Sequence, residues 1–264
     1  MNVFLRELKS HRWGLLFWSI GIVVMVYSGM AKFAAYDAAG QSVVEIMDEL
    51  PTAIRVIFGL EGFDLTTALG FYGILFLYLA VMGAVHAVLL GSQLIAKEER
   101  DRTSEFLFAK PASRNRVITG KLSAGLVMVI AFNLVTLASS LYFVDYFSTD
   151  EAFAEEMLVL MTGLLFVQLI FFSIGALVAG TSHRPKAAAS RATSIMFFTY
   201  LLYYAVNLNE SWGFLGYFTP FKYFDAAALI ADGLDPFFIG LSAIIIGVAV
   251  FGTYRFYSAR DLTI

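Results

Sequence analysis

The chain contains no cysteine, and its charged residues are scarce. The lack of cysteine excludes disulfide bonds, thiolate metal sites and cysteine nucleophiles. Only 15% of the 264 residues are Asp, Glu, Lys or Arg, whereas a soluble domain carries about 25%. The composition therefore argues against a soluble fold.

The short motifs that hold nucleotides or catalytic metals are also missing. The sequence contains no GxxxxGK[ST] phosphate loop, no GxGxxG and no HExxH. Its three histidines, His11, His86 and His183, are far apart and share no metal-ligand spacing. We therefore expect no catalytic activity, cofactor or metal site in this chain by itself.

What the sequence has in excess is apolar residues, which make up 59% of it. A helix needs about 20 mostly apolar residues to span the hydrocarbon core of a bilayer. Six stretches are predicted to do so, and the fifth is the weakest because it runs into Asn207 and Asn209. They are residues 13–34, 71–96, 118–144, 157–180, 192–207 and 237–256. The prediction is an all-α integral membrane protein with one domain, residues 1–264.

Basic residues are distributed unevenly over the links between these stretches. If the N-terminus is cytosolic, 15 of the 18 Lys and Arg residues fall on the cytosolic side, and only Lys32, Arg55 and Lys222 do not. Cytosolic loops of membrane proteins are enriched in Lys and Arg. We therefore predict a multi-pass protein of the plasma membrane with both termini in the cytosol.

Short helices at the membrane surface are predicted on both sides. Residues 2–12 place apolar side chains on one helical face and charged ones, including Arg6 and Glu7, on the other, which is typical of an interfacial amphipathic helix. The alternative is a frayed basic tail that only orients the first span. On the external side, residues 35–70 and the segment after Pro220 are expected to contain short helices.

The polar residues within the spans give only weak indications of a transport path. Away from their ends the spans contain no Asp or Glu, although gradient-driven transporters usually keep an ionisable group near the membrane midplane. His86, Asn133 and Gln168 are candidates for lining a path. Each of them could equally form a hydrogen bond between helices.

Small residues recur at four-residue spacing in three of the spans. They are Gly83, Ala87 and Gly91 in the second span, Gly120 and Ala124 at the start of the third, and Gly175 with Ala179 and Ala176 with Gly180 in the fourth. Such faces allow close packing of helices in lipid. We favour packing within the chain over a seam between two subunits.

Charge is densest in residues 97–121, KEERDRTSEFLFAKPASRNRVITGK, where 11 of 25 residues are charged. The predicted orientation places this segment in the cytosol, between the second and third spans. Because the chain has neither a nucleotide site nor an ion-coupling site, any energy for transport has to come from a partner. This segment is the expected contact with it.

Residues 97–121 resemble a motif in the permease subunits of ATP-binding-cassette (ABC) transporters of the type-2 export class. There, an ExRGTxExLL…PxSR…GK segment joins the second and third spans, and Arg102 stands where that pattern usually has Gly. The six-span layout extends the resemblance over the whole chain. The resemblance implies two permease subunits, identical or different, that work with two separate ATPase subunits, which bind ATP and Mg²⁺.

The resemblance also implies that residues 97–114 form a coupling helix seated in a cleft of the ATPase. Thr103 can cap a short helix, Phe106 and Leu107 offer an apolar knob, and Pro111 ends the helix. Charged residues are expected to form a rim around the knob. The residues expected at this contact are Glu98, Glu99, Arg100, Thr103, Glu105, Phe106, Leu107, Pro111 and Arg114.

The sequence thus predicts the permease subunit of an ABC exporter, with an ATPase, a second permease and membrane lipid as partners, and no nucleic acid. Two alternatives remain. One is a non-transport membrane module that docks a different cytosolic partner through residues 97–121, and the other is a gradient-driven transporter. A positive-inside loop without a partner is the simplest alternative for that segment.

Overall fold

The computed structural model describes residues 2–39, 51, 54–56, 63–101, 113–148 and 153–259. These residues are mostly helical, and no strand occurs among them. The long helices are α1 (Val3–Ala39), α4 (Ala68–Arg100), α6 (Arg114–Phe147), α7 (Ala154–Thr181), α8 (Pro185–Leu208) and α11 (Pro236–Ala259). The short elements are η1 (Glu210–Phe218), α9 (Pro220–Tyr223) and α10 (Ala226–Asp232).

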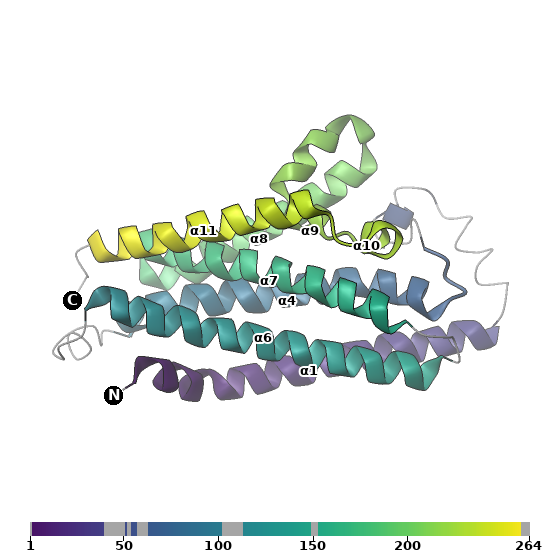
Figure 1. The fold of residues 1–264 in the computed structure, drawn as a ribbon, viewed down its shortest axis with the longest axis horizontal. Coiled ribbons are helices and arrows are strands. Elements are labelled where there is room, and N and C mark those ends of the chain that lie inside the picture. Colours follow the sequence, from purple (N-terminus) through teal and green to yellow (C-terminus); the bar gives the residue numbers. More distant parts are fainter. Residues whose placement is uncertain are drawn as a thin grey trace.

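The long helices run side by side along the longest axis of the molecule, as Figure 1 shows. α1, α6 and α8 begin at the same end at which α4, α7 and α11 finish. We call this the basic end, because most of the described Lys and Arg residues that flank the spans lie there. η1, α9 and α10 lie toward the opposite end. α4 is central and packs against α7, α8, α1 and α6.

Among the described residues, five helices are long and apolar enough to cross a membrane: α1, α4, α6, α7 and α11. α8 lies at the position of the predicted fifth span but does not reach this level, because its first half is rich in Ser, Thr, Lys and Arg. The prediction of an all-helical membrane protein is confirmed. Five of the six predicted spans are supported among the described residues.

The structure differs from the prediction of a separate N-terminal surface helix. Residues 3–12 are the first turns of α1, which continues without interruption to Ala39. Leu5 is exposed and Glu7 is completely buried. Glu7 of the charged face therefore packs inward, whereas Lys9 stays exposed. After Pro220, the chain does form the short helices α9 and α10, and of the predicted external segment 35–70 most residues lie outside the described ones.

A close helix contact joins α4 and α7 at two glycines. A methyl group on Gly91 would overlap the backbone oxygen of Phe172, and one on Gly175 would overlap the backbone oxygen of Val88. In each helix, a glycine thus packs directly against the backbone of the other helix. The interpretation of these small residues as packing within the chain is confirmed here.

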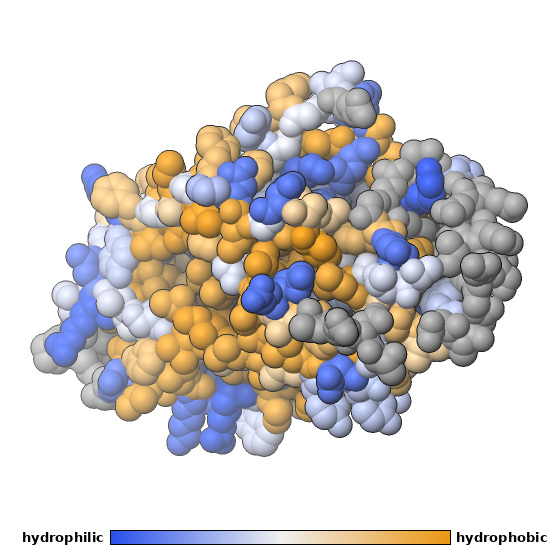
Figure 2. All heavy atoms as spheres, turned by 45° about the vertical axis from the view of Figure 1, so that its right-hand side comes forward, coloured by the Kyte–Doolittle hydropathy of each residue, from blue (hydrophilic) through white to orange (hydrophobic). Residues whose placement is uncertain are grey.

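Large apolar side chains cover much of the middle of the face seen in Figure 2. Over the described structure as a whole, the exposed large apolar side chains include Phe17, Phe198 and Phe251, each about two-thirds or more exposed. Soluble monomers rarely expose apolar surface on this scale. The surface fits a protein that lies in lipid.

Candidate functional site: a buried charge chain

Five charged side chains from three helices meet at the basic end. Arg6 and Glu7 come from the first turns of α1, Lys97 and Glu98 from the last turn of α4, and Lys121 from the second turn of α6. Acids and bases alternate in the order Lys97, Glu7, Arg6, Glu98, Lys121. We call this set the buried charge chain. Lys97 and Glu98 belong to the predicted coupling segment 97–114, and Lys121 lies in the second turn of the helix that follows it.

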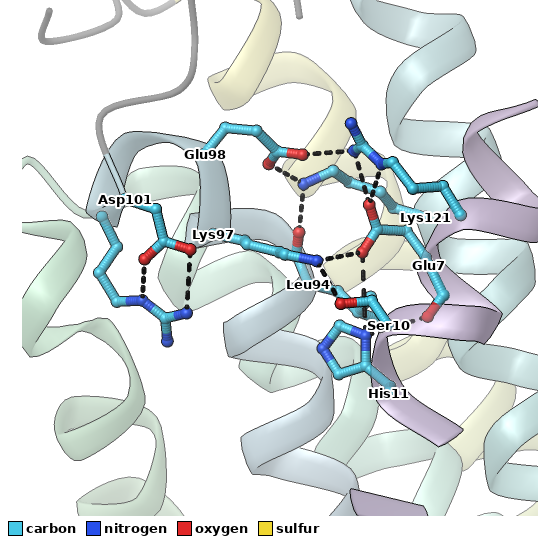
Figure 3. Close-up of polar contacts among 10 residues, drawn as sticks. Glu7, Ser10, His11, Leu94, Lys97, Glu98, Asp101 and Lys121 are labelled. Atoms are coloured by element: carbon cyan, nitrogen blue, oxygen red, sulfur yellow. Dashed lines mark hydrogen bonds and ion pairs between the residues drawn. The ribbon is translucent and has the colours of Figure 1, made fainter. Parts of the chain in front are cut away.

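The geometry of the buried charge chain is that of charge-assisted hydrogen bonds. Lys97 Nζ lies 3.1 Å from Glu7 Oε2, and the Arg6 guanidinium lies 2.6 Å from Glu7 Oε1 and 2.6 Å from Glu98 Oε1. Lys121 donates to Glu98 Oε2. Figure 3 shows Glu7 and Glu98 pointing toward Lys97 and Lys121, whereas Asp101 lies apart from them. α1, α4 and α6 are therefore tied together by direct ionic contacts.

Neutral groups complete the bonding of the lysines. Lys121 Nζ also donates to the backbone oxygen of Leu94, and Lys97 Nζ donates to Ser10 Oγ at 2.8 Å. His11 Nδ1 lies 3.1 Å from the backbone oxygen of Glu7. These contacts, drawn in Figure 3, add one bond between α6 and α4, one between α4 and α1, and one within α1.

The innermost members of the chain are almost inaccessible to solvent. Glu7 is 0% exposed, Glu98 3% and Lys121 1%. Burying charges in this way is costly unless every charge has a partner, and removing one partner of a buried pair costs about 3–5 kcal/mol. The three side chains therefore depend on one another, and a shift of one helix disturbs the others.

The remaining described residues of the predicted contact are arranged differently. Glu99 is buried in the last turn of α4. Arg100 is exposed and donates from Nε to Asp101 Oδ1 at 3.0 Å, a hydrogen bond that lowers the pKa of the Asp101 carboxyl group. Arg114 donates to the backbone oxygen of Ser258 in α11 at 3.1 Å. Only Arg100 is placed as a solvent-exposed rim residue would be.

Glu98 also differs from the expected rim. Arg6 and Lys121 hold its carboxylate inside the bundle, so its contact with an ATPase stays a prediction. Thr103, Glu105, Phe106, Leu107 and Pro111 lie outside the described residues. The coupling helix itself therefore stays a prediction too.

The three candidate path residues all lie within the helix packing. His86 is buried between Trp18 and Phe132, with ring centroids 5.5 and 4.5 Å away. Asn133 Nδ2 donates to the backbone oxygen of Met161 at 3.1 Å, which joins α6 to α7. Gln168 is completely buried, and its amide has no hydrogen-bond partner among the described residues. Their role in a translocation path stays a prediction.

A cavity of about 250 Å³ lies toward the opposite end, between α4, α7, α8 and the short helices. Tyr203 donates to Asp225 at 2.8 Å, and Lys222 donates to Asn207 at 2.8 Å. Aromatic and aliphatic side chains form the rest of the wall, and neither His86 nor Gln168 is among them. The polar groups at its wall are thus already bonded to one another.

Of the buried charge chain only Glu98 was predicted as a site residue, and sequence reasoning missed Arg6, Glu7, Lys97 and Lys121. Residues 2–12 were assigned by their amphipathic pattern, which places Glu7 on a water-facing side. A signal was nevertheless present, because Lys121 lies inside the apolar stretch 118–144. A lysine at such a position needs an anionic partner.

The comparison with known families agrees with the resemblance of residues 97–121. No match was found among curated proteins. The model of the family described as ABC-2 family transporter protein matches residues 1–261. Because this match covers nearly the whole chain, the protein belongs to the ABC-2 transporter family.

Proposed function

We propose that the chain is the membrane-spanning permease subunit of an ATP-driven exporter, with its basic end in the cytosol. Family membership supports a membrane component of an ABC transporter. Since the chain has no phosphate loop, separate ATPase subunits supply the energy and bind ATP and Mg²⁺. Two of these and a second permease subunit complete the transporter.

The proposal rests on one observation, which is the position of the buried charge chain. α4 ends at Arg100 and α6 begins at Arg114, so the segment between them is attached at both ends to helices that Glu98 and Lys121 connect. Arg6 extends the connection to α1. A force applied to the segment therefore reaches three helices at once.

Ionic contacts suit this task because they are directional and tolerate little displacement. In a low-dielectric interior a charge that loses its partner is strongly penalised. We therefore expect the first turns of α1 and α6 and the last turn of α4 to move as one body when an ATPase moves the segment. Thr103, Glu105, Phe106, Leu107 and Pro111 provide the contact with the ATPase in this proposal.

Purification of the tagged full chain from its native membranes tests the proposal. We expect a phosphate-loop ATPase to copurify in equal amounts, and the complex to hydrolyse ATP faster than the ATPase alone. The proposal is wrong if the stoichiometric partner lacks a phosphate loop, since that identifies a non-transport module. It is also wrong if the chain alone, in proteoliposomes, transports with a proton or sodium gradient.

A further inference from the structure

One face of α11 combines exposed apolar side chains with a basic residue at the basic end. Ile244, Val248, Phe251 and Arg255 follow one another at intervals of four, three and four residues, so they form a single stripe along the helix. The three apolar members are 64%, 64% and 72% exposed. Arg255 is exposed as well and makes no ion pair with any described residue.

The length of this stripe matches one leaflet of a bilayer. At a rise of about 1.5 Å per residue, Ile244 and Arg255 are separated by about 16 Å along the helix axis. The hydrocarbon core of a bilayer is about 30 Å thick, so one leaflet contributes about 15 Å. An acyl chain that lies along the stripe therefore brings its head group to Arg255.

A groove of about 350 Å³ opens at this position between α6 and α11, at the end where the two helices lie near each other in Figure 1. The groove is shallow and largely open to its surroundings. Asn115, Phe251, Tyr254, Arg255, Ser258 and Ala259 line it.

Hydrogen bonds between the two helices hold the walls of the groove in place. Thr119 Oγ1 lies 2.8 Å from Tyr254 Oη, and Ser258 Oγ donates to Asn115 Oδ1 at 2.8 Å. Neither the Asn115 amide nitrogen nor the Arg255 guanidinium has a hydrogen-bond partner among the described residues. No acidic residue is among the described residues that line the groove. The chemistry of the lining therefore favours a ligand that carries a negative charge.

We infer that this groove binds the head group of an anionic phospholipid from the leaflet at the basic end. The phosphate accepts hydrogen bonds from Arg255 and Asn115, and one acyl chain lies on Phe251, Val248 and Ile244. Basic pockets between transmembrane helices bind anionic head groups in this way. The inference uses the membrane setting of the chain but does not depend on the partner ATPase.

Thermal unfolding of the detergent-purified full chain, titrated with long-chain phosphatidylglycerol, tests the inference. We expect saturable stabilisation by phosphatidylglycerol and none by phosphatidylcholine or by glycerol phosphate, because binding needs both the charge and the acyl chain. A hydrogen bond to a charged group contributes about tenfold or more in affinity. Arg255→Gln should therefore raise the half-saturating lipid concentration about tenfold, and Phe251→Ala should raise it as well.

Arg116→Gln is the matched control, since Arg116 is an exposed basic residue at the same end that does not line the groove. It should leave the titration unchanged. Equal weakening by Arg116→Gln and Arg255→Gln would show only general attraction to charged lipid and would overturn the inference. A loss of dimers in the Arg255 and Phe251 variants, without a change in lipid response, would identify this face as a subunit seam instead. Neither outcome affects the proposed coupling to an ATPase.

Discussion

The ammonium group of Lys121 in α6 contacts the carboxylate of Glu98 in α4 inside the helix bundle, with both side chains shielded from solvent. Thirteen residues, 101–113, separate the two helices along the chain, and this pair joins the helices directly. The pair therefore holds the end of α4 close to the start of α6, the two helices that the predicted coupling segment connects.

Loss of the Glu98 charge should destabilise the protein more than loss of an exposed charge. Glu98→Gln leaves the buried ammonium of Lys121 without its counterion, which should cost about 3–5 kcal/mol. Thermal unfolding followed by tryptophan fluorescence measures the effect. Asp101→Asn is the control, because its pair with Arg100 is exposed and should contribute at most about 1 kcal/mol.

The double variant Glu98→Gln/Lys121→Met should be less destabilised than the sum of the two single variants, because it removes both charges. If the two losses are simply additive, Glu98 and Lys121 do not interact in the membrane, and the link between α4 and α6 is absent.

The predicted orientation can be tested with cysteine labelling, which is clean here because the chain has no cysteine of its own. Ser113 and Ser211 are both exposed and lie toward opposite ends of the bundle. We expect an impermeant maleimide to label Ser211→Cys in intact cells and Ser113→Cys only after the membrane is opened. Labelling of Ser113→Cys in intact cells would place the basic end outside.

Asn133 and Gln168 should respond in opposite ways to removal of their amides. Asn133→Leu removes a bond to Met161, and such bonds in membrane proteins contribute about 0.6 to 1.7 kcal/mol. Gln168→Met removes a buried amide without a partner among the described residues, so stability should stay equal or rise. Melting temperatures of the two variants compare these effects. A marked loss of stability in Gln168→Met would show that its amide has a partner in the membrane.

The helices and most of their bounds could be predicted from the sequence because long apolar stretches in lipid have little alternative to helix. The start of α1 shows the limit of this reasoning. Its amphipathic pattern indicates two faces, but the direction of each face depends on what packs against it. Lys97 and Glu98 lie about 90 residues away in sequence, and no local pattern predicts that contact.

The candidate site could be predicted only in part, because contacts between distant parts of the sequence decide which charges are buried. Residues 97–121 were identified from their order, and Glu98 does lie at the end of the second span. That Glu98 points inward depends on Lys121, one helix away, and on Arg6. Pairing between charges that lie on different helices requires the three-dimensional arrangement.

The glycines between α4 and α7 give a prediction about packing. Gly91→Ala and Gly175→Ala each place a methyl group against the backbone of the other helix, which cannot yield by a side-chain rotation. Overpacking of this kind typically costs about 1–3 kcal/mol. Gly247→Ala in α11 is the control, because no atom beyond its chain neighbours and the adjacent backbone of its own helix lies within 4 Å of the added methyl group. A similar melting temperature for all three variants would show that α4 and α7 are not in close contact.

The coupling segment gives the prediction on which the proposed function depends. If Phe106 and Leu107 enter an ATPase cleft, truncation of either to Ala removes a central anchor and should weaken binding by about 2 kcal/mol or more. The permease should keep its melting temperature, because neither residue lies in a span. Phe198→Ala is the control, since it removes an exposed aromatic ring from α8. Copurified ATPase and ATP hydrolysis measure the result. If both segment variants retain the ATPase as Phe198→Ala does, the segment is a solvated loop and coupling takes place elsewhere.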